Sequence, residues 1–184
     1  QPISSNDDRY HLVCNGEIYN YVELKNKMIK KGYRFKTNSD VEVIIPIFIF
    51  YGADGFKLLD GMFSFTLLDT QKNEMYLCRD RYGIKPLYYL HRDDGALYFA
   101  SEIKSILKID SNLDLNQFAI IDYLIYGYSD SASSVWENIM KLTPGHYIKI
   151  SRERFDIFPL IIEKEIKFYK NKNDAKKDLR EALI

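Results

Sequence analysis

The sequence predicts an α+β fold, in which antiparallel strands and helices lie in layers. Two observations indicate this class. Short apolar runs are separated by polar turn sequences that are typical of hairpins, and amphipathic helical segments are interleaved with these runs. The chain has 184 residues, of which 46% are apolar and 28% charged, so it has the length and composition to bury a core of its own.

Residues 9–16 are predicted to form a strand that ends in an Asn-Gly turn. A helix should follow, with Asn20 as its N-cap, Glu23 completing a capping box and Gly32 at its end. The apolar stripe of this helix is expected to consist of Tyr21, Leu24, Met28 and Ile29. The segment 33–36 is predicted to be a short strand.

Ser39 is predicted to cap a second helix, with Glu42 three residues further on and Gly52 at the helix end. One face of this helix should be apolar, with Val43, Ile47, Phe48 and Tyr51. Pro46 would remove one backbone hydrogen bond and kink the helix, so residues 41–50 could equally form a strand.

The rest of the chain is dominated by hairpin signals, the strongest being Asp-Asp-Gly between two apolar runs. Strands are predicted at 61–69, 74–80, 86–92, 96–102 and 146–151, and helices at 101–108 and 115–128. After residue 152 the pattern is weak until an amphipathic helix begins with Leu179 and Leu183.

The composition argues against several classes of function. Basic and acidic residues balance at 26 each, so no overall positive field indicates a nucleic-acid partner. The longest apolar run is shorter than the roughly 18 residues that a membrane span needs. No secretory signal is predicted, and two cysteines do not make a disulfide framework, so we expect a protein of the reducing cytoplasm.

Five motifs occur in order and with close spacing: NGEIYN at 15–20, SDVE at 39–42, LLDGMFSFTLLD at 58–69, RDRYGIKPLYY at 79–89 and FASEIKSIL at 99–107. Together they resemble the class II (N-terminal nucleophile) glutamine amidotransferase domain of glutamine-hydrolysing asparagine synthetases. The likeness is close over residues 1–107 and looser through LTPGHYIKI, and DLREALI at the C-terminus looks like the linker helix of that family.

The resemblance implies an αββα four-layer sandwich of the N-terminal nucleophile hydrolase type, incomplete at its N-terminus. We expect residues 1–151 to form the amidotransferase domain without its N-terminal segment. Residues 152–184 would be the linker and first helix toward a missing synthetase domain, so the chain is expected to be truncated at both ends.

The function that this resemblance implies is part of the glutaminase half of an asparagine synthetase. Such an enzyme hydrolyses glutamine and passes the ammonia to a second domain, where ATP activates aspartate and asparagine forms. The expected partners are glutamine, the covalently following synthetase domain and a second copy in a homodimer, with no nucleic acid and no membrane. No cofactor is expected in this domain, and ATP and Mg²⁺ would belong to the missing synthetase domain.

The site residues follow from the matching motifs. The Asn15 side-chain amide and the Gly16 backbone N–H would form the oxyanion hole, and Glu17 and Asp40 would bind the α-ammonium group of glutamine. Other interpretations exist: an ordinary Asn-Gly turn, a solvated surface acid at Glu17, and at Asp40 an acid that offsets a helix macrodipole. The motif RDRYGIKPLYY is interpreted as structural, and no metal site is expected.

Neither cysteine is the expected nucleophile. Cys14 and Cys78 lie within apolar strands, where a free cysteine is usually a small buried residue. A cysteine–histidine hydrolase is disfavoured, because His11, His91 and His146 all occur in ordinary strand or turn contexts. By resemblance, the nucleophilic cysteine and an arginine for the α-carboxylate would precede Gln1, so this chain alone is expected to be inactive.

Two alternative functions remain open. The chain could belong to another synthetase with the same amidotransferase half, which amidates a sugar acid or a cell-surface intermediate. It could also be a non-catalytic, amidotransferase-like binding module.

Overall fold

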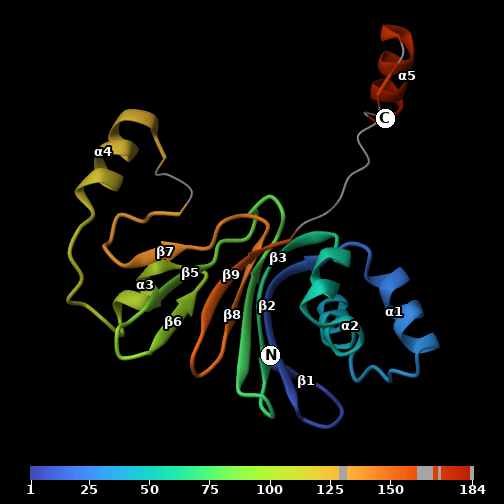
Figure 1. Cartoon of the computed structure of the whole chain (residues 1–184), viewed down its shortest axis with the longest axis horizontal. Coiled ribbons are helices and arrows are strands. Elements are labelled where there is room, and N and C mark those ends of the chain that lie inside the picture. Colours follow the sequence, from blue (N-terminus) through green and yellow to red (C-terminus); the bar gives the residue numbers. More distant parts are fainter. Residues whose placement is uncertain (129–131, 161–167, 170, 183–184) are drawn as a thin grey trace.

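Figure 1 shows a computed structural model of the chain, which describes residues 1–128, 132–160, 168, 169 and 171–182. Two antiparallel sheets lie between helices. Helices α1 and α2 cover one side of the larger sheet, and the smaller sheet and α3 lie on its other side (Figure 1). The α+β class and the four-layer αββα sandwich are therefore confirmed.

The larger sheet has six strands in the order β1-β2-β3-β4-β8-β9, and every neighbouring pair is antiparallel. The strands are β1 (Ile3–Ser4), β2 (Tyr10–Ile18), β3 (Gly61–Asp69), β4 (Glu74–Arg79), β8 (His146–Ile150) and β9 (Phe155–Pro159). The predicted strands of β3, β4 and β8 are confirmed. β1 and β9 are short edge strands that the sequence pattern did not reveal.

The smaller sheet has three strands in the order β6-β5-β7. They are β5 (Tyr88–His91), β6 (Leu97–Ala100) and β7 (Ile139–Lys141). The β5–β6 hairpin was predicted from its Asp-Asp-Gly turn, whereas β7, with three residues, was not. All of this sheet lies in sequence between β4 and β8, which are neighbours in the larger sheet.

The helical elements alternate with these strands along the chain. They are α1 (Tyr21–Lys30), the 3-10 turns η1 (Asp40–Val43) and η2 (Gly52–Leu58), and the helices α2 (Ile44–Tyr51), α3 (Ile103–Leu107), α4 (Gln117–Tyr126) and α5 (Lys172–Ala182). Leu179 lies in α5 as predicted, and Leu183 lies outside the described residues.

Among the residues that the structure describes, three apolar clusters fill the spaces between the four layers. Tyr76 and Cys78 of β4 point into the cluster beneath α1 and α2, while Leu77 points into the cluster between the two sheets. This is the alternation expected of a strand with two covered faces. The third cluster joins Leu90 of β5 to Ile106 of α3 on the outer face of the smaller sheet. Each layer is thus held to the next by its own core.

The prediction that Asn20 closes a capping box is wrong. Asn20 precedes α1, but its Nδ2 donates to the carbonyl of Leu58 (2.9 Å) and its Oδ1 accepts from the backbone N–H of Asp60 (3.1 Å). The side chain therefore ties the start of α1 to the start of β3. Ile29, predicted to lie in the apolar stripe, is 51% exposed because the turn of the helix carries it away from the buried side.

Residues 33–36 do not form the predicted strand. The backbone N–H groups of Lys36 and Thr37 donate to the carboxylate of Glu42, each at 2.7 Å, and not to a neighbouring strand. Glu42 is buried by these contacts, so it is unavailable for a capping box with Ser39, whose side chain makes no cap hydrogen bond.

The segment around Pro46 is helical, so the alternative of a strand over residues 41–50 is wrong. Pro46 is the third residue of α2 and follows the 3-10 turn η1, and the first turn of a helix tolerates proline because its N–H groups need no intrahelical partner. Gly52 ends α2 at φ 62°, as predicted.

Helix α4 is confirmed and stands at the margin of the molecule (Figure 1). Asn116 caps it by accepting from the backbone N–H of Ala119 at 3.1 Å, and Gly127 ends it in the left-handed conformation. Most of its apolar side chains are exposed, including Phe118 at 83% and Leu124 at 76%.

Candidate functional site

The central element of the candidate site is the second half of β2. Asn15 lies opposite Ser64 of β3, and Glu17 lies opposite Met62. Because successive side chains of a strand alternate, Asn15 and Glu17 share one face of the sheet, while Cys14 points to the other. The predicted turn at Asn15 and Gly16 is therefore wrong: both residues are paired within a strand that continues to Ile18.

Gly16 is the residue that this strand requires. Its φ of 148° is rare for a residue with a side chain, and a Cβ atom there would lie 2.1 Å from the carbonyl oxygen of Met62. Glycine alone allows β2 and β3 to approach this closely. The strand therefore passes straight through a position where any other residue would force the two strands apart.

The edge of β2 that faces away from β3 carries backbone groups of Cys14, Gly16 and Ile18. The N–H and C=O of Cys14 bond outward to the side-chain amide of Gln1, both at 2.7 Å, and the N–H of Ile18 donates outward to Oδ2 of Asp40, also at 2.7 Å. Backbone groups two residues apart point the same way in an antiparallel ladder. The Gly16 N–H and C=O therefore face the same edge, between these two occupied positions.

The Asn15 side chain reaches from the larger sheet to the end of the smaller one. Its Nδ2 donates to the hydroxyl Oγ of Ser101 at 3.2 Å, directly after β6. An amide nitrogen carries two N–H donors, so this contact leaves one of them for a ligand. Ser101 belongs to the motif FASEIKSIL, but it was not predicted as a site residue, and nothing in its spacing pointed to Asn15.

The two predicted acids are placed differently. Asp40 begins η1, and its bond to Ile18 brings it beside the strand that carries the other site residues. Glu17 is exposed on the face that it shares with Asn15. The structure thus brings all four predicted residues to one end of β2.

Both cysteines are buried, and the pKa of each thiol is raised. Cys14 is 7% and Cys78 0% exposed, and neither forms a disulfide. Burial, with a smaller contribution from the charge of Asp40, raises the pKa of the Cys14 thiol to about 12. Burial likewise raises the pKa of Cys78 well above its usual value. A nucleophilic cysteine needs the opposite shift, so the structure disfavours both as nucleophiles.

Two buried charged residues, Arg79 and Asp80, organise the turn next to this site through bonds to the backbone. The guanidinium of Arg79 donates to the carbonyls of Gly83 (2.6 Å), Lys85 (2.8 Å) and Leu142 (2.6 Å). Asp80 accepts from four backbone N–H groups, those of Phe63, Tyr82, Ile84 and Lys85. The sequence predicted a structural role for this motif, and these contacts agree with it. Arg79 lies in the same cross-strand row as Ser64 and Asn15, so its contacts connect this turn to the part of the sheet that carries the site.

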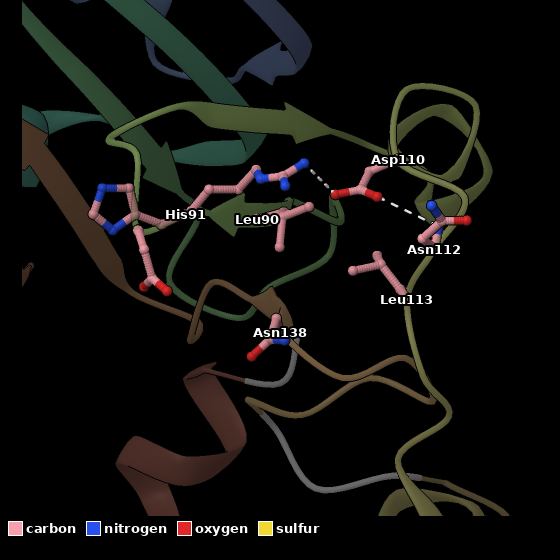
Figure 2. A pocket seen from close by; sticks show the side chains of 8 residues that line it. Leu90, His91, Asp110, Asn112, Leu113 and Asn138 are labelled. Carbon is pink, nitrogen blue, oxygen red and sulfur yellow. Dashed lines mark hydrogen bonds and ion pairs between the residues drawn. The ribbon is translucent and has the colours of Figure 1, made fainter.

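A polar cavity of about 400 Å³ lies elsewhere, beside the smaller sheet (Figure 2). Its residues are Leu90, His91, Arg92, Asp93, Asp110, Asn112, Leu113 and Asn138. Arg92 is already paired with Asp110 at 2.7 Å, and none of the four predicted site residues lines this cavity. It therefore gives no support to the glutamine site.

The described residues contain neither a metal-binding cluster nor a helix that could span a membrane. No three or more His, Cys, Asp or Glu side chains in this part of the chain are placed to share a metal ion. No helix in the same part of the chain has the length and apolarity needed to cross a membrane.

The sequence of the chain is similar to those of known proteins. Residues 1–159 match the family described as the glutamine amidotransferase domain. A glutamine-hydrolyzing asparagine synthetase 1 of Bacillus subtilis is 33% identical over 184 residues, which are 100% of this chain and 29% of that protein. A putative glutamine-hydrolyzing asparagine synthetase 1 of Methanocaldococcus jannaschii is 44% identical over 114 residues, which are 62% of this chain and 20% of that protein. The chain thus spans less than a third of these relatives.

Solved structures share the fold. The glutamine phosphoribosylpyrophosphate amidotransferase of B. subtilis, complexed with ADP and GMP, matches 89% of this chain and 32% of its own chain, with a TM-score of 0.60 and 20% identity. An allosteric regulatory enzyme of purine biosynthesis matches equally well, with a TM-score of 0.60. At this identity the likeness concerns the fold and not the substrate.

Proposed function

The chain belongs to the glutamine amidotransferase domain family, and from this premise we propose that it forms the glutaminase part of an asparagine synthetase. In the proposed reaction, glutamine is hydrolysed and its ammonia is used for the ATP-dependent amidation of aspartate. Relatives named as glutamine-hydrolyzing asparagine synthetases support this choice over a synthetase that amidates a sugar acid.

The observation that carries the proposal is the edge of β2 at Gly16. Attack on the side-chain amide of glutamine turns its carbonyl oxygen into an oxyanion, which needs fixed hydrogen-bond donors. The Gly16 N–H faces an edge that is filled on either side by Gln1 and Asp40, and Asn15 has a second amide N–H to offer. Two such donors from adjacent residues would form the oxyanion hole.

Substrate recognition is assigned to the two acids. The α-ammonium group of glutamine would lie between the carboxylates of Asp40 and Glu17, as a cation that needs charge-assisted hydrogen bonds. Asp40 is held in place by Ile18, so its position is fixed before a ligand binds. Preorganisation of this kind reduces the entropic cost of binding.

The remaining components would come from outside this chain. Because Cys14 and Cys78 are buried, we assign the nucleophile to a cysteine that precedes Gln1. Its thiolate would add to the amide carbon to give the tetrahedral oxyanion. Collapse of this species, with a proton delivered to the nitrogen by the α-amine of that cysteine, would release ammonia and leave a thioester that water hydrolyses to glutamate. ATP and Mg²⁺ would bind to a synthetase region that follows.

The proposed domain division places the amidotransferase domain at residues 1–151 and the linker at residues 152–184. Strand β9 would then be the part of the linker that pairs with β8. A cytoplasmic location is part of the same proposal.

The test is ammonia release from glutamine by the full-length protein that contains this chain. Asn15→Ala should lower kcat by about 10²–10³-fold, because one oxyanion donor is lost. KM should change less, since this donor matters most once charge has developed. Asn26→Ala, an exposed asparagine on α1, is the matched control. Equal kcat values for Asn15→Ala and the parent protein would contradict the proposal.

A further inference from the structure

The contact between Asn15 and Ser101 joins the two sheets of the sandwich. Asn15 lies within the larger sheet, paired with Ser64 of β3, and Ser101 directly follows the last strand residue of β6 in the smaller sheet. The 3.2 Å bond between Asn15 Nδ2 and Ser101 Oγ is a side-chain contact between residues that are far apart in sequence.

We propose that Ser101 is a positioning residue, which holds the Asn15 carboxamide in the rotamer that the oxyanion hole requires. This inference rests on the proposed function. Asn15 is exposed, and the side chain of an exposed asparagine ordinarily samples several rotamers. An oxyanion donor must be fixed before the reaction, because its benefit depends on needing no reorganisation as charge develops.

Ser101 is well suited to this role because its own backbone is anchored on both sides. Before it, Ala100 pairs with Tyr88 of β5, and after it α3 begins at Ile103. Ile106 of α3 is 1% exposed and packs in the third apolar cluster. The hydroxyl is therefore presented from a rigid frame and not from a long loop, as a supporting contact requires.

The placement also explains why the hydroxyl does not compete with the ligand. Ser101 accepts one of the two N–H groups of the Asn15 amide and leaves the other one free. Ser101 thus needs no contact with glutamine, and its effect should be on the chemical step more than on substrate binding.

The first experiment measures kcat and KM for glutamine hydrolysis by the full-length protein. Ser101→Ala should lower kcat by about tenfold, the effect of losing one supporting hydrogen bond, with little change in KM. Ser101→Thr keeps the hydroxyl and should retain most of the activity. Ser105→Ala, the same substitution on the exposed side of α3, is the matched control and should leave kcat unchanged.

The second experiment needs no activity and uses the 184-residue chain. The side-chain NH₂ signals of Asn15 are followed by NMR in ¹⁵N-asparagine-labelled protein and assigned by their loss in Asn15→Asp. Ser101→Ala should shift one of the two Asn15 amide protons, and Ser101→Thr and Ser105→Ala should not.

The outcomes separate this inference from the function on which it rests. Glutamine hydrolysis that is unaffected by Ser101→Ala, or Asn15 signals that do not change in this variant, would overturn the positioning role alone. A full-length protein that releases no ammonia from glutamine would overturn the proposed function and this role with it. A Ser101→Ala variant with a raised KM and an unchanged kcat would make Ser101 a binding residue and would equally overturn the inference.

Discussion

The carboxylate of Asp40 accepts a hydrogen bond from the backbone N–H of Ile18, at 2.7 Å between N and Oδ2. A residue at the start of a 3-10 turn is thereby fixed to the edge of β2, two residues from Gly16. The same contact satisfies a strand N–H that would otherwise face the free edge, so Asp40 has a structural role besides the proposed role in binding.

Asp40→Asn should separate these two roles. The amide oxygen of asparagine can still accept from Ile18, so the thermal midpoint should stay close to that of the parent protein. The lost charge removes a partner of the substrate ammonium, and a hydrogen bond to a charged group contributes about 1.5–3 kcal/mol, so KM for glutamine should rise by roughly 10–100-fold. Steady-state kinetics and a thermal melt on the full-length protein would check this. An unchanged KM with a lowered midpoint would assign Asp40 to structure alone.

Gly16→Ala should destabilise the chain severely. The new Cβ would lie 2.1 Å from the carbonyl oxygen of Met62 and would also require an alanine at φ 148°. We expect a loss of about 3 kcal/mol or more in the free energy of unfolding, measured by urea denaturation.

Gly95→Ala is the control for this variant. Gly95 also has a positive φ, of 85°, but no atom lies within 4 Å of its added Cβ, so only the backbone cost of about 1–2 kcal/mol should appear. If Gly16→Ala and Gly95→Ala lost the same unfolding free energy, the close contact between β2 and β3 would not be the cause of the destabilisation by Gly16→Ala.

The sequence predicts the regular parts of the fold well and its tertiary contacts poorly. The hairpin of β3 and β4 follows from long apolar runs around a polar turn. Short strands such as β7, with three residues, carry too little pattern to be recognised. Asn20 has a residue type and spacing that favour a cap, but tertiary contacts with Leu58 and Asp60 take its side chain.

For the candidate site, too, the sequence predicted some features and missed others. The motifs identified Asn15, Gly16, Glu17 and Asp40, and the structure brings them together at one end of β2. The strand conformation at Gly16 was not predicted, because Asn-Gly is also a common turn sequence and only the pairing with Phe63 distinguishes the two.

Arg79→Met should reveal how strongly the turn after β4 depends on one buried guanidinium. The variant would leave the three carbonyls of Gly83, Lys85 and Leu142 without their charged donor, inside a region where Arg79 is only 3% exposed. We expect a loss of about 3 kcal/mol or more in the free energy of unfolding. Arg81→Met, the same substitution at an exposed position, should cost less than about 0.5 kcal/mol. Similar losses for both would contradict a special role for Arg79.

Asp69 should make stability depend on pH in the acid range. Its hydrogen bonds to the Arg9 guanidinium, at 2.7 and 2.9 Å, hold the pKa of this carboxyl below its usual value. The resulting stabilisation is fully present above the unfolded pKa of about 4 and is lost as the pH falls through the lower folded pKa.

Asp69→Asn tests this dependence. The variant should lose about 2 kcal/mol of unfolding free energy at pH 7, and its difference from the parent should shrink progressively below about pH 4. Asp54→Asn changes a side chain that is 89% exposed, so its difference in unfolding free energy from the parent should not shrink in this way as the pH falls. If the difference in unfolding free energy between Asp69→Asn and the parent stayed constant down to pH 2, the ion-pair explanation would be contradicted.

The cysteines should resist alkylation in the folded chain. Burial raises the pKa of Cys14 to about 12, so almost no thiolate is present at pH 8, and Cys78 is fully buried. Iodoacetamide at pH 8 should therefore label neither residue in the native protein and both in urea, as measured by mass spectrometry. Rapid labelling of native Cys14 would show that its thiol is accessible and would make Cys14 a candidate nucleophile.

The pairing of β4 with β8 has a consequence for how the chain folds. Cys78 lies opposite Tyr147, so the smaller sheet, α3 and α4 form an insertion between two adjacent strands of the larger sheet. The β3–β4 and β8–β9 hairpins can each form from neighbouring sequence, but β8 has to close a long loop before it pairs with β4. We therefore expect β8 and β9 to join the sheet last, after the inserted layer has condensed.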